Sequence, residues 1–219
     1  MEIEIVENVM QYNKEEAELN RRLFLKNKIL AINILSAPGA GKTSLIMETI
    51  KKLKGKFNIG IIEGDISSTY DAEKLKTFID DVVQINTGGT CHLNASMVSR
   101  ALQKLSIESL DILLIENVGN LICPVGFDLG EKYKVILSSV SEGDDKPVKY
   151  PKAFVRANLI VLNKIDMFKY SNFKYDFFEA KVREINQECP ILKISCKNGK
   201  GINNWLSWID LEVKKIISS

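Results

Sequence analysis

The stretch SAPGAGKTS, residues 36–44, follows the apolar run ILAINIL at residues 29–35 and decides the fold. A buried strand, a tight glycine-rich loop and a helix start, in this order, are typical of a phosphate-binding loop. Gly39 and Gly41 are expected where the backbone needs a positive φ or must approach phosphate oxygens without a Cβ. Ser36 replaces the first glycine of the usual pattern, which we interpret as tolerable because this residue only begins the turn. The alternative is a glycine-rich turn that binds nothing.

The residues at the end of this loop carry the chemistry of phosphate binding. Lys42 is expected to reach the β- and γ-phosphates, and Thr43 is expected to offer a hydroxyl to Mg²⁺. The helix that begins here adds the partial positive charge of its N-terminus. The predicted phosphate-binding residues are Gly39, Ala40, Gly41, Lys42, Thr43 and Ser44.

The composition narrows the class of protein. The 219 residues suffice for one well-buried α/β domain with an appendage. A net charge of +2 gives no overall field for nucleic acid or a membrane surface, so neither is expected as a partner. No apolar stretch approaches the roughly 20 residues of a membrane span, and the acidic start MEIE is unlike a signal peptide. We expect a cytoplasmic protein whose four cysteines are free thiols or metal ligands.

Strand-like and helix-like segments alternate after the loop, which predicts an α/β fold with a mostly parallel sheet and helices on both faces. Residues 7–28 have apolar positions at near-helical spacing and predict an amphipathic helix before the sheet. The polar stretch 141–150 is expected to be mobile. Further strands are predicted at residues 57–62, 82–85, 111–115, 135–140, 159–162 and 191–194, and helices at residues 43–54, 71–79, 94–105, 177–187 and 202–217.

Polar residues after two of the later strands predict which nucleobase the protein binds. Such sheets bind ligands at the carboxyl ends of their strands. Asp166 in the motif NKID can accept two hydrogen bonds from guanine that adenine cannot donate, and the wrong base would leave this carboxylate unpaired. An ordinary loop with a Lys/Asp pair is the alternative. The motif SCK after the last strand resembles the fifth motif of GTP-binding domains, whose backbone supports the guanine. The predicted guanine site comprises Asn163, Lys164, Asp166, Ser195, Cys196 and Lys197.

These motifs predict a P-loop NTPase that binds GTP or GDP with Mg²⁺. We divide the chain into an N-terminal helical extension, residues 1–28, and a GTP-binding domain, residues 29–219.

A Mg²⁺ ion bound by Thr43 beside the phosphates needs further ligands, and carboxylates are expected because Mg²⁺ prefers oxygen. Asp65 and Glu116 both follow strands and complete the predicted Mg²⁺ site with Thr43. The motif ENVG stands where GTP-binding proteins resembling Ras carry Asp-x-x-Gly, so the N–H of Gly119 is expected to sense the γ-phosphate. No glutamine follows Gly119, so we expect slow hydrolysis. The predicted catalytic residues are Lys42, Asp65 as a candidate to orient the water, and Glu116.

A second candidate site contains the one histidine of the sequence, His92, beside Cys91, and Cys123 four residues past Gly119. Such ligands suit Zn²⁺ and Ni²⁺. Three ligands leave a four-coordinate site unfinished, so two chains at a symmetric interface, or water, would complete it. The alternative is two core thiols and a surface histidine. Cys123 follows the segment that should move when the γ-phosphate is lost, which favours a metal site that responds to the nucleotide.

The motifs GAGKT, EGD, GGTCHL, ENVGNLICP and NKID together resemble the GTPases that mature the metal centres of hydrogenase and urease, from residue 32 to about residue 208. The stretch ENVGNLICP is that of the hydrogenase branch. The resemblance implies a GTP-dependent homodimer that inserts nickel into [NiFe]-hydrogenase large-subunit precursors with a HypA-type nickel chaperone. It also places Cys91, His92 and Cys123 on the metal-binding motif of the family. The N-terminal cysteine motif and histidine-rich stretch of some members have no counterpart here, so neither tight N-terminal nickel binding nor nickel storage is expected.

Two other functions fit the same motifs. One is a metal carrier in which GTP serves only as an assembly ligand. The other is a related GTPase that matures another metalloenzyme, such as urease or a cobalamin-dependent enzyme, with zinc or with no metal. A small-molecule kinase is a more distant alternative.

Overall fold

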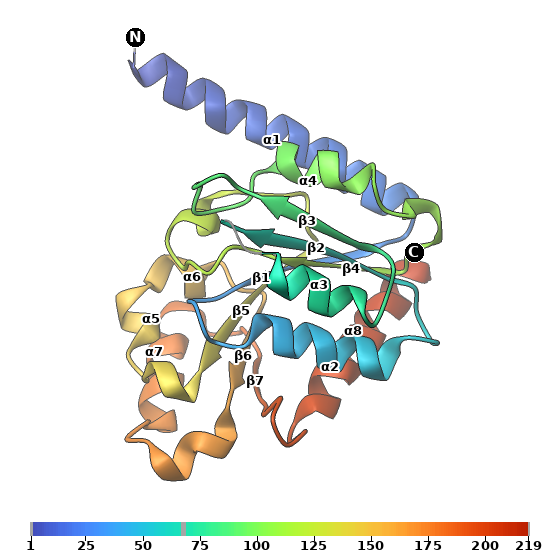
Figure 1. Cartoon of the computed structure of the whole chain (residues 1–219). Coiled ribbons are helices and arrows are strands. Elements are labelled where there is room, and N and C mark those ends of the chain that lie inside the picture. Colours follow the sequence, from blue (N-terminus) through green and yellow to red (C-terminus); the bar gives the residue numbers. More distant parts are fainter. Residues whose placement is uncertain (1, 67–68, 219) are drawn as a thin grey trace.

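The structure, a computed structural model, describes residues 2–66 and 69–218. Within this part of the chain, a seven-stranded parallel sheet has the order β3-β2-β4-β1-β5-β6-β7 (Figure 1). The strands are β1 Leu30–Leu35, β2 Ile59–Asp65, β3 Val82–Asn86, β4 Ile112–Glu116, β5 Tyr133–Ser139, β6 Leu159–Asn163 and β7 Ile191–Lys193. The predicted parallel sheet of a P-loop NTPase is confirmed.

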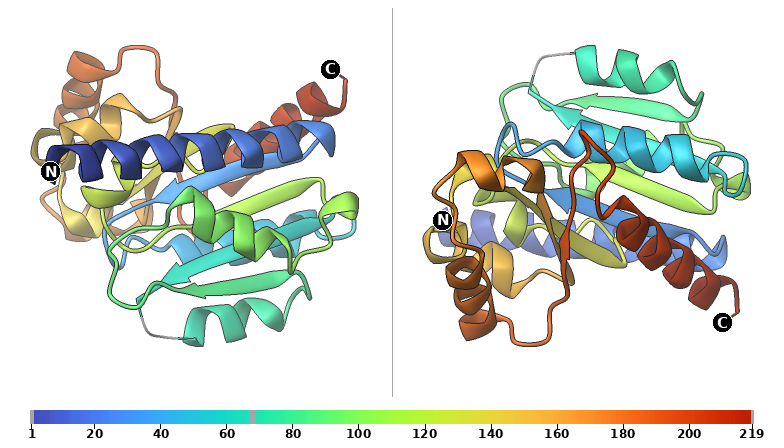
Figure 2. Two further views of the ribbon diagram at one scale, coloured as in Figure 1. Left: turned by 90° about the horizontal axis from the view of Figure 1, so that it is seen from above. Right: turned by 90° about the horizontal axis from the view of Figure 1, so that it is seen from below.

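Helices cover both faces of the sheet, which explains why the central strands β1, β4 and β6 are buried at every position. One face packs against α2, α3 and α8, and the other packs against α1, α4, α6 and α7. Figure 2 shows α1 and α4 over one face and α2 and α8 over the other. The helices are α1 Glu2–Lys26, α2 Lys42–Leu53, α3 Tyr70–Lys76, α4 Ala95–Leu102, α5 Lys146–Lys149, α6 Pro151–Val155, α7 Tyr175–Ile185 and α8 Ile202–Ile217.

The stretch 141–150 differs from its prediction as a mobile polar segment. It holds the end of a 3-10 helix, η3 Val140–Glu142, and the short helix α5, and α6 follows directly. Both short helices have a proline in the first turn, where the missing N–H costs no hydrogen bond. Four- and five-residue helices are too short to display an apolar period, so the sequence pattern could not reveal them.

The predicted N-terminal helix is present as α1, and directional hydrogen bonds hold it to the body of the protein. The Nδ2 of Asn20 donates to Ala95 O at 2.9 Å and to Leu129 O at 3.0 Å, while Asn13 Oδ1 accepts from Ala95 N at 2.9 Å. Gly130 has a φ of +91°, and a Cβ there would lie 2.6 Å from a backbone oxygen of α1. The helix therefore has one fixed position against residues 95 and 129–130. No described helix combines the length and apolar character needed to cross a membrane.

Candidate functional site

The phosphate loop joins β1 to α2 with the geometry that its glycines allow. Gly39 and Gly41 have φ values of +79° and +102°, as expected for a loop that turns its N–H groups inward. A Cβ on Gly41 would also lie 2.6 Å from Nδ2 of Asn163, so this position needs glycine for its contact as well as for its conformation. The loop opens onto a hollow of about 440 Å³ lined by the end of β2 and residues after β4.

Ser36 acquires a role that the sequence did not reveal. It is fully buried, and it is absent from the described residues with positive φ, so no glycine is needed there. Its Oγ accepts a hydrogen bond from Nζ of Lys42 at 3.1 Å. The serine hydroxyl thus holds the ammonium group beside the loop.

Carboxylates gather at the cation end of the hollow. The Oγ1 of Thr43 donates to Glu116 Oε1 at 2.9 Å, and Glu63 is the register partner of Glu116 on β2. Burial raises the pKa of Glu116 to about 7, and burial together with the charge of Glu116 raises the pKa of Glu63 to about 8. Among the described residues, Oε2 of each of these two glutamates is buried without a hydrogen-bond partner. With Asp65 on the same wall, this all-oxygen donor set fits Mg²⁺.

Three charged residues of this hollow received no role in the sequence analysis. Asp71 and Lys74 enter from α3, and no motif marks them. Glu63 lies two residues before Asp65, and alternate residues of a strand share a face, so that spacing could have found it. Residues 67–68, between β2 and α3, lie outside the described residues.

The guanine end of the site is built from hydrogen bonds between loops. Asn163 Nδ2 donates to Ala40 O at 2.9 Å, and Lys164 Nζ donates to Gly39 O at 2.7 Å. The backbone N–H of Cys196 donates to Asn163 Oδ1 at 3.2 Å. The NKID loop, the SCK loop and the phosphate loop are therefore tied together.

Asp166 lies at the edge of a second hollow of about 250 Å³, which Lys197 and Met167 also line. Its Oδ1 accepts a hydrogen bond from Ser195 Oγ at 2.6 Å, and this bond lowers the pKa of the Asp166 carboxyl. The fully buried Ser195 thus contributes its hydroxyl, where the sequence had suggested only backbone support. Met167 was missed, and nothing in the motif marks it.

The predicted metal ligands Cys91, His92 and Cys123 are neighbours in the structure. Cys91 Sγ lies 3.8 Å from His92 Nδ1, and a hydrogen bond with the Cys123 thiol raises the pKa of Cys91. The His92 ring stacks on Phe127 with centroids 3.9 Å apart, and burial lowers its pKa, which favours the neutral imidazole that metals bind. Across residues 2–66 and 69–218, no group of three or more His, Cys, Asp or Glu side chains is arranged to hold a metal ion.

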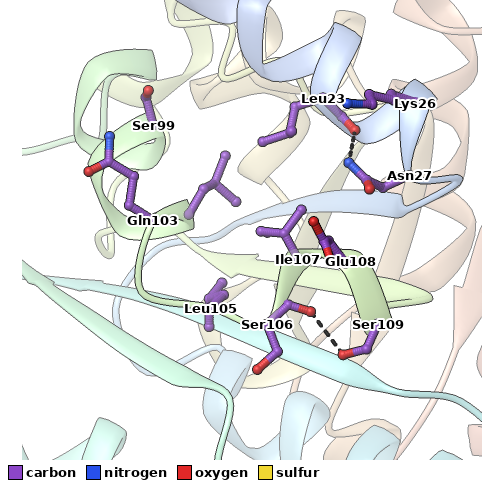
Figure 3. Close-up of a pocket in the computed structure, with 11 residues that line it drawn as sticks. Leu23, Lys26, Asn27, Ser99, Gln103, Leu105, Ser106, Ile107, Glu108 and Ser109 are labelled. Carbon is purple, nitrogen blue, oxygen red and sulfur yellow. Dashed lines mark hydrogen bonds between the residues drawn. The ribbon is translucent and has the colours of Figure 1, made fainter.

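A larger hollow, of about 820 Å³, lies at the opposite end of the sheet (Figure 3). It opens between the end of α1, α4 and the 3-10 helix η1 Ile107–Ser109. Leu23 and Ile107 contribute apolar surface, and Lys26 and Glu108 contribute one charge each. None of the predicted site residues lines it, so size does not identify the functional site in this protein.

Comparison with known proteins identifies the family that the motifs predict. The family model of the CobW/HypB/UreG nucleotide-binding domain matches residues 30–193. The chain belongs to the CobW/HypB/UreG family. Several of its relatives are HypB proteins. The hydrogenase maturation factor HypB of Escherichia coli K12 is 44% identical over 212 residues, which are 97% of this chain and 72% of that protein.

Two further comparisons are with HypB of Helicobacter pylori. The hydrogenase/urease maturation factor HypB of strain J99 is 35% identical over 218 residues, 98% of this chain and 89% of that protein. A crystal structure of HypB from this organism in complex with nickel superposes with a TM-score of 0.88 at 34% identity, covering 93% of this chain and 96% of that one. The predicted resemblance to the hydrogenase branch is confirmed.

Proposed function

We propose that this chain hydrolyses GTP slowly in the cytoplasm and uses the nucleotide state to control nickel delivery to [NiFe]-hydrogenase precursors. One observation carries the proposal. The seven-residue connection that follows Glu116 ends at Cys123, so a single segment touches Thr43 at one end and Cys91 at the other. The HypB relatives, and the nickel complex of one of them, support the choice of metal and pathway.

Each residue near the phosphate loop has a separate role in GTP hydrolysis. Lys42 and the N-terminus of α2 place positive charge against the transferred phosphoryl group. Thr43, Asp65 and Glu116 would hold Mg²⁺, which neutralises charge on the phosphate oxygens when bound. Asp65 is the candidate to orient the attacking water. The absence of a glutamine after Gly119 leaves no other water-positioning side chain in this segment, so we expect a low rate.

Base selection rests on Asp166. Its carboxylate accepts the N1–H and exocyclic amine of guanine, and the hydrogen bond from Ser195 fixes the orientation of the carboxylate. Adenine offers no such pair of donors and would leave a charge unpaired.

Nickel or zinc is the cargo of Cys91, His92 and Cys123 in this proposal. The three side chains do not complete a site within the described chain, which supports a site shared by two copies in a GTP-dependent homodimer or finished by water. Ile122, next to Cys123, is 70% exposed and adds apolar surface for such an interface. A HypA-type chaperone would supply the metal and the hydrogenase large-subunit precursor would accept it.

Nickel transfer to an acceptor protein tests the proposal, measured with GTP and with its non-hydrolysable β,γ-imido analogue. We expect several-fold more transfer with GTP, and no specific transfer from a variant with Cys91→Ala and Cys123→Ala. Equal transfer with the two nucleotides would instead support a carrier for which GTP is only an assembly ligand.

A second function has support from one relative. The Helicobacter pylori J99 protein carries urease as well as hydrogenase in its name. The same transfer assay with a urease precursor as acceptor distinguishes the targets, because delivery to only one precursor would identify it.

A further inference from the structure

Leu93, which follows Cys91 and His92, is held in place by residues near the phosphate loop. Leu93 comes directly after His92 and is fully buried. Its side chain covers Gly64, where a Cβ would lie 2.8 Å from Leu93 Cδ1. Gly64 separates Glu63 from Asp65 on β2, so this leucine packs against the strand that carries two of the carboxylates.

The backbone of Leu93 is fixed from a second direction. Its N–H donates to Asn117 Oδ1 at 3.2 Å, and the same oxygen accepts the N–H of Val118 at 3.0 Å. The Nδ2 of Asn117 donates to Asn33 Oδ1 at 3.2 Å. Asn117 is 1% exposed and Asn33 is fully buried, so water cannot replace these bonds without opening the structure.

Asn117 also lies in the segment that meets the phosphate loop. It follows Glu116 directly, and Gly119 comes two residues later. A Cβ on Gly119 would lie 3.2 Å from Pro38 Cγ, which places this glycine against the phosphate loop. Any displacement of residues 117–119 by the γ-phosphate must therefore move the carboxamide that holds Leu93.

We propose that Asn117 is a positioning residue that transmits the nucleotide state to the Cys91–His92 loop through its hydrogen bond to Leu93 N. The inference rests on the proposed function, since it requires that the metal site and the nucleotide site be coupled. Asn117 also lines the hollow at the phosphate end, so its coupling role is read from the dependence of one affinity on the other and not from either affinity alone.

The experiment compares Ni²⁺ affinity of the full chain in GDP with that in the β,γ-imido analogue of GTP. For the unmodified chain we expect the two affinities to differ by about fivefold or more. In Asn117→Ala we expect the ratio to fall to within about twofold of one, with Ni²⁺ still bound in both states. By reciprocity, the effect of Ni²⁺ on affinity for the analogue must fall by the same factor.

Asn186→Ala is the matched control. Asn186 Nδ2 donates to the backbone oxygens of Phe154 and Ala157 at 2.8 and 3.0 Å, at the end of α7 and away from both sites. The control loses hydrogen bonds and thermal stability as Asn117→Ala does, but it should keep the ratio of the unmodified chain.

A second variant, Leu93→Ala, keeps the backbone bond to Asn117 but removes the buried side chain that packs on Gly64 and in one core cluster with Val98 and Ile62. A shift of the Asn117 carboxamide is then no longer passed on to a fixed side chain. We expect it to lower the ratio as well, and it supplies the test if Asn117→Ala does not fold. Folded variants of either kind with the unmodified ratio would overturn the inference. A ratio of one in the unmodified chain would instead overturn the proposed coupling itself, so the two failures are distinguishable.

Discussion

The two ends of the nucleotide site differ in how many of their polar groups already have partners. At the guanine end, Asp166 accepts from Ser195, and Asn163 and Lys164 donate to carbonyls of the phosphate loop. At the phosphate end, Oε2 of Glu63 and Oε2 of Glu116 are buried without partners among the described residues. The guanine end is therefore organised by the protein alone, whereas the phosphate end keeps two buried carboxylate oxygens that a cation can use.

The largest expected effect is on GTP affinity, when the charge of Asp166 at the guanine end is removed. Asp166→Asn should weaken GTP binding about a hundredfold or more, because two charge-assisted hydrogen bonds to guanine are lost. The amide can donate to the extra oxygen of xanthine, so xanthosine triphosphate should become the better ligand. Nucleotide titration of the variant measures both changes. Asp176→Asn on the exposed face of α7 is the matched control, and retained preference for GTP would contradict the guanine assignment.

An effect of intermediate size is expected at the phosphate end, on the stability of the protein. Glu63→Gln should raise the free energy of unfolding by about 1–2 kcal/mol at neutral pH without nucleotide and Mg²⁺. Burial and the charge of Glu116 raise the pKa of Glu63, so folding requires this carboxyl to take up a proton, which a glutamine does not need. Denaturant unfolding with a chelator present measures this effect. The gain should shrink when GTP and Mg²⁺ are added, since the cation then balances the carboxylate.

The exposed Glu108→Gln, at the other end of the sheet, is the control for Glu63→Gln and should change stability by less than about 0.5 kcal/mol. A loss of stability in Glu63→Gln under metal-free conditions would mean that the glutamate is already balanced by the protein.

The smallest expected effect is on GTP affinity, when the Ser195 hydroxyl at the guanine end is removed. Ser195→Ala removes the hydroxyl that orients Asp166 but leaves the carboxylate in place. A single hydrogen bond contributes about 0.5–1.5 kcal/mol, so GTP affinity should fall by about two- to tenfold while the preference over xanthosine triphosphate persists. Competition between the two nucleotides gives the measurement. An unchanged affinity would show that Asp166 is oriented by the backbone alone.

Most of the fold was predictable from the sequence, because apolar strands and phosphate-loop glycines leave local signatures. The positive φ values at Gly39 and Gly41 follow from the motif itself. The helices α5 and α6 escaped because they are shorter than the apolar period that would mark them.

The parts of the candidate site that escaped depend on contacts between distant segments. Ser36 was predicted only to be tolerable in place of glycine, whereas its hydroxyl holds Lys42. Asn117, between Glu116 and Gly119, received no role from the sequence, although its carboxamide joins three segments. A side chain whose partners are backbone N–H groups and amides far along the chain leaves no pattern in a single sequence.

The hydrogen bonds of α1 have a mechanical consequence. A helix packed only through leucines can slide or rotate at modest cost, but Asn13 and Asn20 bond to fixed backbone atoms and allow one register only. Figure 1 shows the first turns of α1 extending beyond the rest of the protein. A force applied to these turns would be transmitted to the backbone at residues 95 and 128–129, which follow the Cys91–His92 loop and Cys123 in the sequence.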